Sequence, residues 1–216
     1  MKKGLTELVF ILDRSGSMSG LESDTIGGFN SMLKKQLEVD GECRITTALF
    51  DHEYELLHDR IDIHAVEAMT EEEYYVGGAT ALIDAIGMTI QKISNAEKNT
   101  KDGYRAEKVM FVIITDGEEN SSREYSAAQV KALVEDKKSK EGWEFIFLGA
   151  NIDSVQTAGR FGISADRAVD YIADSEGTQL NYSAMADAVA SYRSSGMVDE
   201  SQFEVIRDDV KRRKRK

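Results

Sequence analysis

The sequence predicts an α/β fold with a doubly wound, mostly parallel sheet of six strands, and three observations support this. Apolar segments of strand length alternate along the chain with amphipathic segments of helical period. Two segments, Leu8–Leu12 and Val109–Thr115, are continuous apolar runs of the kind that parallel sheets bury on both faces. The 216 residues, 41% of them hydrophobic, are enough to bury a core without disulfides or a structural metal.

The first half of the chain supplies two parallel strands and a returning strand. Leu8–Leu12 is predicted to be a central buried strand, and Asp24 is expected to cap a helix over residues 25–39. Arg44–Phe50 predicts the second strand. After a polar turn, Tyr54–Ile63 is expected to return as an antiparallel strand at the edge of the sheet.

The second half continues the alternation of helices and strands. Strands are predicted at Val109–Thr115, Trp143–Leu148 and Ala168–Ile172. Helices are predicted at Ala65–Met69, Leu82–Ser94, Ser126–Lys140, Asp153–Phe161 and residues 175–195. Asp153 is interpreted as the cap of its helix. Helices are therefore expected on both faces of the sheet.

Charge divides the chain unevenly and suggests a single domain over residues 1–200 followed by a polar, basic tail over residues 201–216. The net charge is −12, although the last six residues, Lys211–Lys216, are all basic. The rest of the chain therefore carries −18 and should repel nucleic acid and anionic membranes. The tail could attract either, or it could be a frayed, solvated end.

The single cysteine and the apolar runs bear on location. Cys43 excludes an internal disulfide framework and is interpreted as a small core residue. Leu8–Leu12 is too short for a signal sequence, and the longest apolar run, Val109–Ile114, is too short to span a membrane. We therefore expect a cytoplasmic protein that makes no membrane contact.

Oxygen-bearing side chains follow both strongly apolar strands and a glycine loop. Asp13, Ser15 and Ser17 come directly after the first strand at alternate positions, so their side chains can point the same way. Thr80 follows Gly77-Gly78 at the start of a helix, and Asp116 follows the other apolar strand. Since ligands of such sheets bind at the carboxyl ends of the strands, these three groups are expected to meet at one edge.

The five side chains offer only oxygen ligands. Two carboxylates and three hydroxyls suit a hard cation, Mg²⁺ or Mn²⁺, with Ca²⁺ a poorer fit. The set contains no His or Cys, which argues against zinc. Because neutral hydroxyls leave a cation short of negative charge, we expect a protein partner to complete the site with an Asp or Glu side chain.

Three motifs together resemble the metal-ion-dependent adhesion site (MIDAS) of the von Willebrand factor A (vWA) domain. They are Asp13-x-Ser15-x-Ser17, Thr80 after the Gly-Gly loop, and Thr115-Asp116-Gly117. The resemblance spans about residues 5–195 and implies the Rossmann-like vWA fold. It also implies that Ser15, Ser17 and Thr80 contact the metal directly, and that Asp13 and Asp116 do so directly or through water. The chain is similar to stand-alone cytoplasmic members of prokaryotes and phages, which implies a non-enzymatic, metal-dependent adhesion or adaptor module.

Two other functions remain as alternatives. A Mg²⁺-dependent hydrolase is one, but a dehalogenase-type phosphatase would have a second Asp where Ser15 stands, and no phosphate-binding P-loop motif is present. Nucleic-acid association through Lys211–Lys216 is the other, and the acidic body opposes it. Glu118, Glu119 and Asn120 follow Asp116 and should lie on the same rim, either to tune partner choice, to bind a second ion or as a solvated loop.

Overall fold

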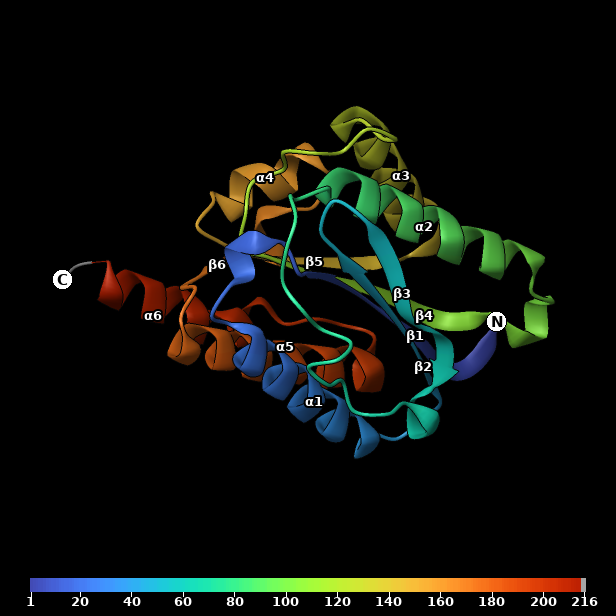
Figure 1. Cartoon of the computed structure of the whole chain (residues 1–216). Coiled ribbons are helices and arrows are strands. Elements are labelled where there is room, and N and C mark those ends of the chain that lie inside the picture. The colour runs from blue at the N-terminus through green and yellow to red at the C-terminus, as the bar shows by residue number, and fades with distance from the viewer. Residues whose placement is uncertain (215–216) are drawn as a thin grey trace.

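The computed structural model describes residues 1–214 and contains one six-stranded sheet (Figure 1). Its strands are β1 (Lys2–Asp13), β2 (Cys43–Phe50), β3 (Tyr54–Asp62), β4 (Ala106–Thr115), β5 (Glu144–Ala150) and β6 (Ala168–Tyr171). Their order across the sheet is β3-β2-β1-β4-β5-β6, and only β3 runs antiparallel to its neighbour. The predicted fold is confirmed, with the two most apolar strands side by side at the centre.

Helices cover both faces of the sheet (Figure 1). One face carries α1 (Glu22–Leu37), α5 (Ser175–Ser195) and α6 (Glu204–Arg213). The other carries α2 (Leu82–Asn99), α3 (Ala127–Glu141) and α4 (Ser154–Arg160). Each parallel crossover thus returns the chain to the same edge of the sheet, which places the loops after β1 and β4 together.

Strand alternation divides the core into two layers. Along β1, Phe10 and Leu12 pack toward α1 and α5, whereas Val9 and Ile11 pack toward α2. The central strands β4 and β5 alternate in the same way, so their side chains are buried on both faces. Burial on both faces explains why these strands are continuously apolar in the sequence.

The first helix begins earlier than predicted. It starts at Glu22 and ends at Leu37, and its N-cap residue, Leu21, makes no side-chain capping bond. Asp24 lies inside the first turn, so its predicted role as the cap is wrong. Its carboxylate instead accepts hydrogen bonds from Ser175 Oγ at 2.9 Å and Gln179 Nε2 at 3.1 Å, on α5. A contact between distant helices therefore replaces the expected local cap.

The segment after β3 is not the predicted helix over Ala65–Met69. A short 3-10 turn covers Ile63–Ala65, and the chain then continues without helical bonds. The amide of Asn30 on α1 bonds both backbone groups of Met69, at 2.8 and 2.9 Å. Because the Asn30 side chain on α1 bonds the backbone of Met69, that residue needs no helical hydrogen bonds. The segment therefore lies extended along α1. The predicted cap Asp153 is confirmed at α4.

Residues 204–213, which the sequence placed in a polar tail, form α6. Phe203, Ile206 and Val210 are buried on its inner side. Arg212 and Arg213 pair with Asp209, and further ion pairs join them to α5 or to its N-cap. Residues 201–214 are therefore not a frayed end; the last two residues of the predicted basic tail, Arg215 and Lys216, lie outside the described part of the chain.

Cys43 opens β2 and is 1% exposed, as predicted for a core residue. Burial raises the pKa of its thiol to about 12, which keeps it protonated at neutral pH. Within residues 1–214, we find no helix with the length and apolar character that a membrane span requires.

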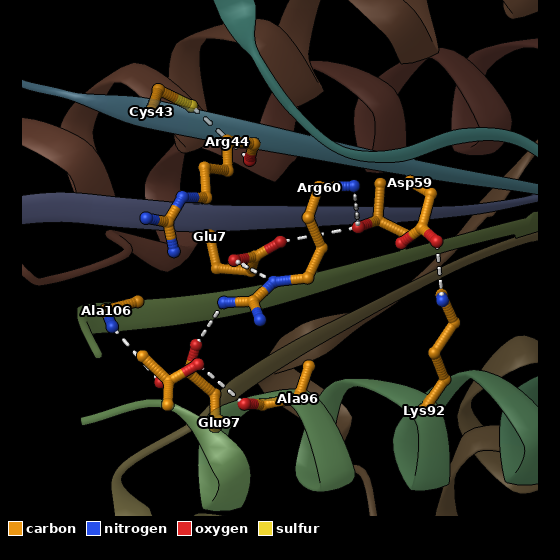
Figure 2. Close-up of polar contacts among 11 residues, drawn as sticks. Glu7, Cys43, Arg44, Asp59, Arg60, Lys92, Ala96, Glu97 and Ala106 are labelled. Carbon is orange, nitrogen blue, oxygen red and sulfur yellow. Dashed lines mark hydrogen bonds and ion pairs between the residues drawn. The ribbon is translucent and has the colours of Figure 1, made fainter. Parts of the chain in front are cut away.

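A buried ion cluster joins the sheet to α2 (Figure 2). Glu7 on β1 is fully buried, and its Oε2 accepts a hydrogen bond from Arg60 Nε at 3.0 Å. Another Arg60 nitrogen donates to Glu97 on α2, which also accepts from the Ala106 amide at 3.1 Å. Arg60 has a left-handed φ of 53°, next to a register shift between β2 and β3. This irregularity places its guanidinium between the two glutamates.

Candidate metal centre

Three loops meet at the carboxyl edge of the sheet. Gly16, in the loop after β1, donates its amide to Gly78 O at 3.2 Å, in the loop before α2. The Asn120 amide, in the loop after β4, donates to Thr80 O at 3.0 Å. Backbone bonds thus hold the three predicted groups against one another, as expected from the neighbouring positions of β1 and β4.

Asp13 is held from both sides at the end of β1. Its Oδ1 accepts from the Ser15 amide at 2.7 Å, and its Oδ2 accepts from Thr115 Oγ1 at 2.6 Å. Its backbone oxygen accepts from Tyr74 Oη at 2.5 Å. Burial raises the pKa of Asp13, and the hydrogen bonds from Ser15 and Thr115 only partly oppose this rise. The carboxylate is therefore fixed in orientation at a cost in solvation.

The three predicted hydroxyls share a small space next to Gly117. The hydroxyl oxygens of Ser15 and Ser17 are 3.0 Å apart. A Cβ built on Gly117 would lie 2.9 Å from Ser17 Oγ and 3.3 Å from Thr80 Oγ1. Any side chain at position 117 would therefore collide with the hydroxyls. The absence of a side chain there lets Ser17 and Thr80 approach Asp116 from the two other loops.

Asp116 is the feature that most needs a ligand. It is 2% exposed, and neither of its carboxylate oxygens has a hydrogen-bond partner within residues 1–214. Burial raises its pKa to about 6; the nearby Ser17 hydroxyl opposes this rise and the Asp13 carboxylate adds to it. A buried carboxylate without a partner is costly, and a bound cation would remove that cost.

The donor set fits a hard divalent cation. Five oxygen-bearing side chains converge, and two of them are carboxylates. No cluster of three or more His, Cys, Asp or Glu side chains suited to a metal occurs in the described chain. A pocket of about 320 Å³ opens above it, lined by Ser17, Thr80 and Gly117 together with Glu118 and Asn120. A ligand from outside can enter there.

The loop after β4 has a supporting role that the sequence did not reveal. Glu119 accepts from the amide of Ile83 at 2.8 Å and from those of Ser121 and Ser122. Asn120 Oδ1 accepts from the Thr80 amide at 2.8 Å. The rim thus positions Thr80 and the start of α2, a role that was not among those expected for it. The bonds to Ile83 and Thr80 cross about 40 positions, and no local signal in the sequence indicates them.

The family comparison now identifies the class of protein. The model of the von Willebrand factor type A domain matches residues 7–182. Since this match covers most of the 216 residues, the chain belongs to the vWA family, as its motifs predicted.

Comparison with solved structures gives the same fold at low sequence identity. Proximal thread matrix protein 1 from the mussel byssus, with a zinc-occupied MIDAS motif, has a TM-score of 0.57 and 14% identity over 86% of this chain and 46% of that one. A von Willebrand factor type A protein from Catenulispora acidiphila has a TM-score of 0.58 and 14% identity over 86% and 42%. Manganese-loaded TRAP protein from Plasmodium vivax has a TM-score of 0.58 and 17% identity over 83% and 73%.

The chain therefore spans less than half the length of the byssal and Catenulispora proteins. No curated protein sequence matches the chain. The similarity to these structures concerns the fold, and the chemistry of the site rests on the residues described above.

Proposed function

We propose that this protein is a divalent-metal-dependent protein-binding module. The module would hold Mg²⁺ or Mn²⁺ with Asp13, Ser15, Ser17, Thr80 and Asp116. A partner protein would complete the coordination with an Asp or Glu carboxylate. The observation that carries the proposal is Asp116, a buried carboxylate without a partner among the described residues, beside hydroxyls from two other loops. The bound metal would supply a positive charge that attracts the partner's carboxylate.

The charge balance of the site supports a partner ligand. Three of the five side chains are neutral hydroxyls, which leave a divalent cation short of negatively charged ligands, and five side chains leave one position of an octahedral ion free. An additional carboxylate can then bind without displacing a protein ligand. The byssal structure has zinc in its MIDAS motif, and the Plasmodium structure is loaded with manganese. We propose Mg²⁺ first for this chain because all five ligands are oxygens.

The two alternatives gain no support from the structure. For nucleic acid, Arg212 and Arg213 already pair with carboxylates of α6 and α5 and with Asp174. For a hydrolase, no described contact places a histidine against Ser15 or Ser17. We further propose a cytoplasmic location, which the buried, reduced Cys43 supports.

Calorimetric titration of Mg²⁺, Mn²⁺ and Ca²⁺ into metal-stripped protein tests the metal site. Wild type should bind Mg²⁺ and Mn²⁺, and Asp116→Ala should not. Glu53→Ala is the matched control: it also removes a carboxylate from this end of the molecule, but Glu53 is exposed and its side chain makes none of the contacts described above. Each variant should retain the circular dichroism spectrum of wild type.

The partner ligand is tested by repeating the titration in acetate, a small carboxylate. Acetate should increase the affinity of wild type for Mg²⁺ and leave Asp116→Ala inactive. If wild type binds no metal in either condition, the proposed site is wrong. If metal binds and acetate has no effect, the proposed partner carboxylate loses its support.

A further inference from the structure

Arg14 is a buried cation inside the first metal loop. It lies between Asp13 and Ser15, is 2% exposed and is among the largest fully buried side chains of the chain. Arginine is almost never buried to this extent without partners. Its position in the motif is one that any residue can fill, so the motif itself gives it no role.

The guanidinium of Arg14 points toward the turn between β2 and β3. Its Nη1 donates to Glu55 Oε2 at 2.6 Å, and its Nε lies 3.5 Å from Asp51 Oδ2. The ring of Tyr75 stacks on it, with 4.7 Å between Cζ and the ring centroid. Two carboxylates therefore neutralise this cation, and its charge does not serve Asp13 or Asp116.

The backbone of Arg14 connects the same parts. Its amide donates to Phe50 O at 2.8 Å, and its oxygen accepts from the Gly77 amide at 2.9 Å. The residue thus joins the loop that carries Ser15 and Ser17 to the end of β2 and to the glycine loop before Thr80.

Asp51 extends this connection to Thr80. Its backbone oxygen accepts from the Ala81 amide at 2.7 Å, one residue after Thr80. Its Oδ1 accepts from the Glu53 amide at 2.6 Å, so the turn is closed on itself. A Cβ on Gly78 would lie only 2.2 Å from the ring of His52, which shows how closely the turn packs on the glycine loop. The Arg14–Asp51 ion pair and the bond from Ala81 to Asp51 therefore link two of the three metal loops.

We propose that Arg14 is a positioning residue for the metal centre. Its side chain holds the β2–β3 turn and Tyr75 against the first loop, and its backbone oxygen holds Gly77. The hydroxyls of Ser15, Ser17 and Thr80 are thereby kept in place before the metal arrives. This inference rests on the proposed function, because it concerns the geometry of that same site. Residues that orient metal ligands typically contribute about ten- to a hundredfold to metal affinity.

The direction in which Mg²⁺ affinity changes distinguishes a positioning role of Arg14 from an effect of its charge alone. Arg14→Gln removes a positive charge from beside a dication site, so an effect of charge alone would tighten Mg²⁺ binding. Loss of positioning would weaken it instead. We expect the dissociation constant for Mg²⁺ to rise about tenfold or more in Arg14→Gln. Arg14→Lys keeps the charge but cannot bond two carboxylates in the same way, and we expect an intermediate loss.

The experiment is the Mg²⁺ titration, carried out on wild type, Arg14→Gln, Arg14→Lys and Asp116→Ala, with unfolding in EDTA measured for each. Glu55→Gln provides a second route if Arg14→Gln fails to fold, because Glu55 is half-exposed and the substitution removes the negative charge that pairs with Arg14. We expect it to weaken Mg²⁺ binding up to about fivefold.

The outcomes distinguish the two proposals. If wild type and Asp116→Ala both fail to bind metal, the proposed function fails. If wild type binds, Asp116→Ala does not, and folded Arg14→Gln or Glu55→Gln binds as tightly as wild type or more tightly, the positioning role of Arg14 is overturned. Weaker binding in the order wild type, Arg14→Lys, Arg14→Gln supports it.

Discussion

Two pairs of buried acidic residues lie at different places around the sheet, and they are neutralised differently. Glu7 and Glu97 share Arg60, which donates to both (Figure 2). Within residues 1–214, no cation pairs with Asp13 or Asp116: the arginine next to Asp13 in sequence donates to Glu55 and forms an ion pair with Asp51 instead.

The two pairs are well separated. Asp13 lies six residues beyond Glu7 on β1, or about 20 Å at roughly 3.3 Å per residue. The comparison teaches that burial of acidic residues does not by itself mark a metal site. A buried acidic pair indicates a metal site when no cationic side chain of the protein neutralises it.

The largest expected effect is at the cluster that the protein neutralises itself. Arg60→Met should leave Glu7 and Glu97 buried without their cation and lower the free energy of unfolding by about 3 kcal/mol or more. Urea denaturation in EDTA and in Mg²⁺ should give the same loss. Arg60→Lys keeps a charge and should lose less. A loss that Mg²⁺ restores would break the comparison, because this cluster would then also respond to metal.

At the metal centre, removing a carboxylate should have the opposite sign. The pKa of Asp116 is about 6 in the folded protein, whereas the ordinary value for an aspartate is 3.8. At pH 7 the ionised carboxylate therefore lowers the free energy of unfolding. Asp116→Asn should therefore stabilise the metal-free protein by up to about 3 kcal/mol. It should also abolish stabilisation by Mg²⁺. Urea denaturation at pH 7.5 checks both, and a less stable metal-free Asp116→Asn would show that the carboxylate is structural.

The pH dependence sharpens the same contrast. Well below pH 3.8, Asp116 is protonated in both states and contributes nothing. As pH rises to about 6, the unfolded state ionises first, so metal-free wild type should lose stability relative to Asp116→Asn across this interval. Protons should also compete with metal, weakening Mg²⁺ binding about tenfold per pH unit below 6. Calorimetry between pH 5 and 7 tests this. A Mg²⁺ affinity that does not change between pH 5 and 7 would contradict a pKa of about 6 for Asp116.

The smallest effect is expected at a single hydrogen bond. Thr115→Val keeps the shape of the side chain but removes the hydroxyl that donates to Asp13 Oδ2. The orientation of Asp13 should loosen, and Mg²⁺ affinity should fall by about 1 kcal/mol, or roughly fivefold. Isothermal titration measures it. An unchanged affinity would mean that the Ser15 amide alone fixes Asp13.

The sheet and the meeting of the site residues were predictable, because both rest on local signals. Val109–Ile114 is apolar throughout, since β4 is buried on both faces; Asp13 ends β1 and Asp116 directly follows β4. Long-range contacts were not predictable. Asp24 looks like a helix cap in sequence, but its partners are Ser175 and Gln179, about 150 residues away.

The helix α6 was missed for a different reason. Its apolar positions Phe203, Ile206 and Val210 have helical spacing, but the many charged residues between them give the segment a polar composition. At the site, the sequence indicated the five candidate ligands without the groups that hold them. Arg14 and Asn120 act through backbone and ion-pair contacts that only the folded chain brings together.

The burial of Cys43 has a practical consequence for studying this module. The thiolate is the reactive form of cysteine, and with a pKa of about 12 and 1% exposure the native thiol should be inert to maleimides at neutral pH. A new cysteine at an exposed position, such as Glu53→Cys beside the metal face, would then be labelled alone. A fluorophore or spin label can thus report on the metal face without replacement of the native residue.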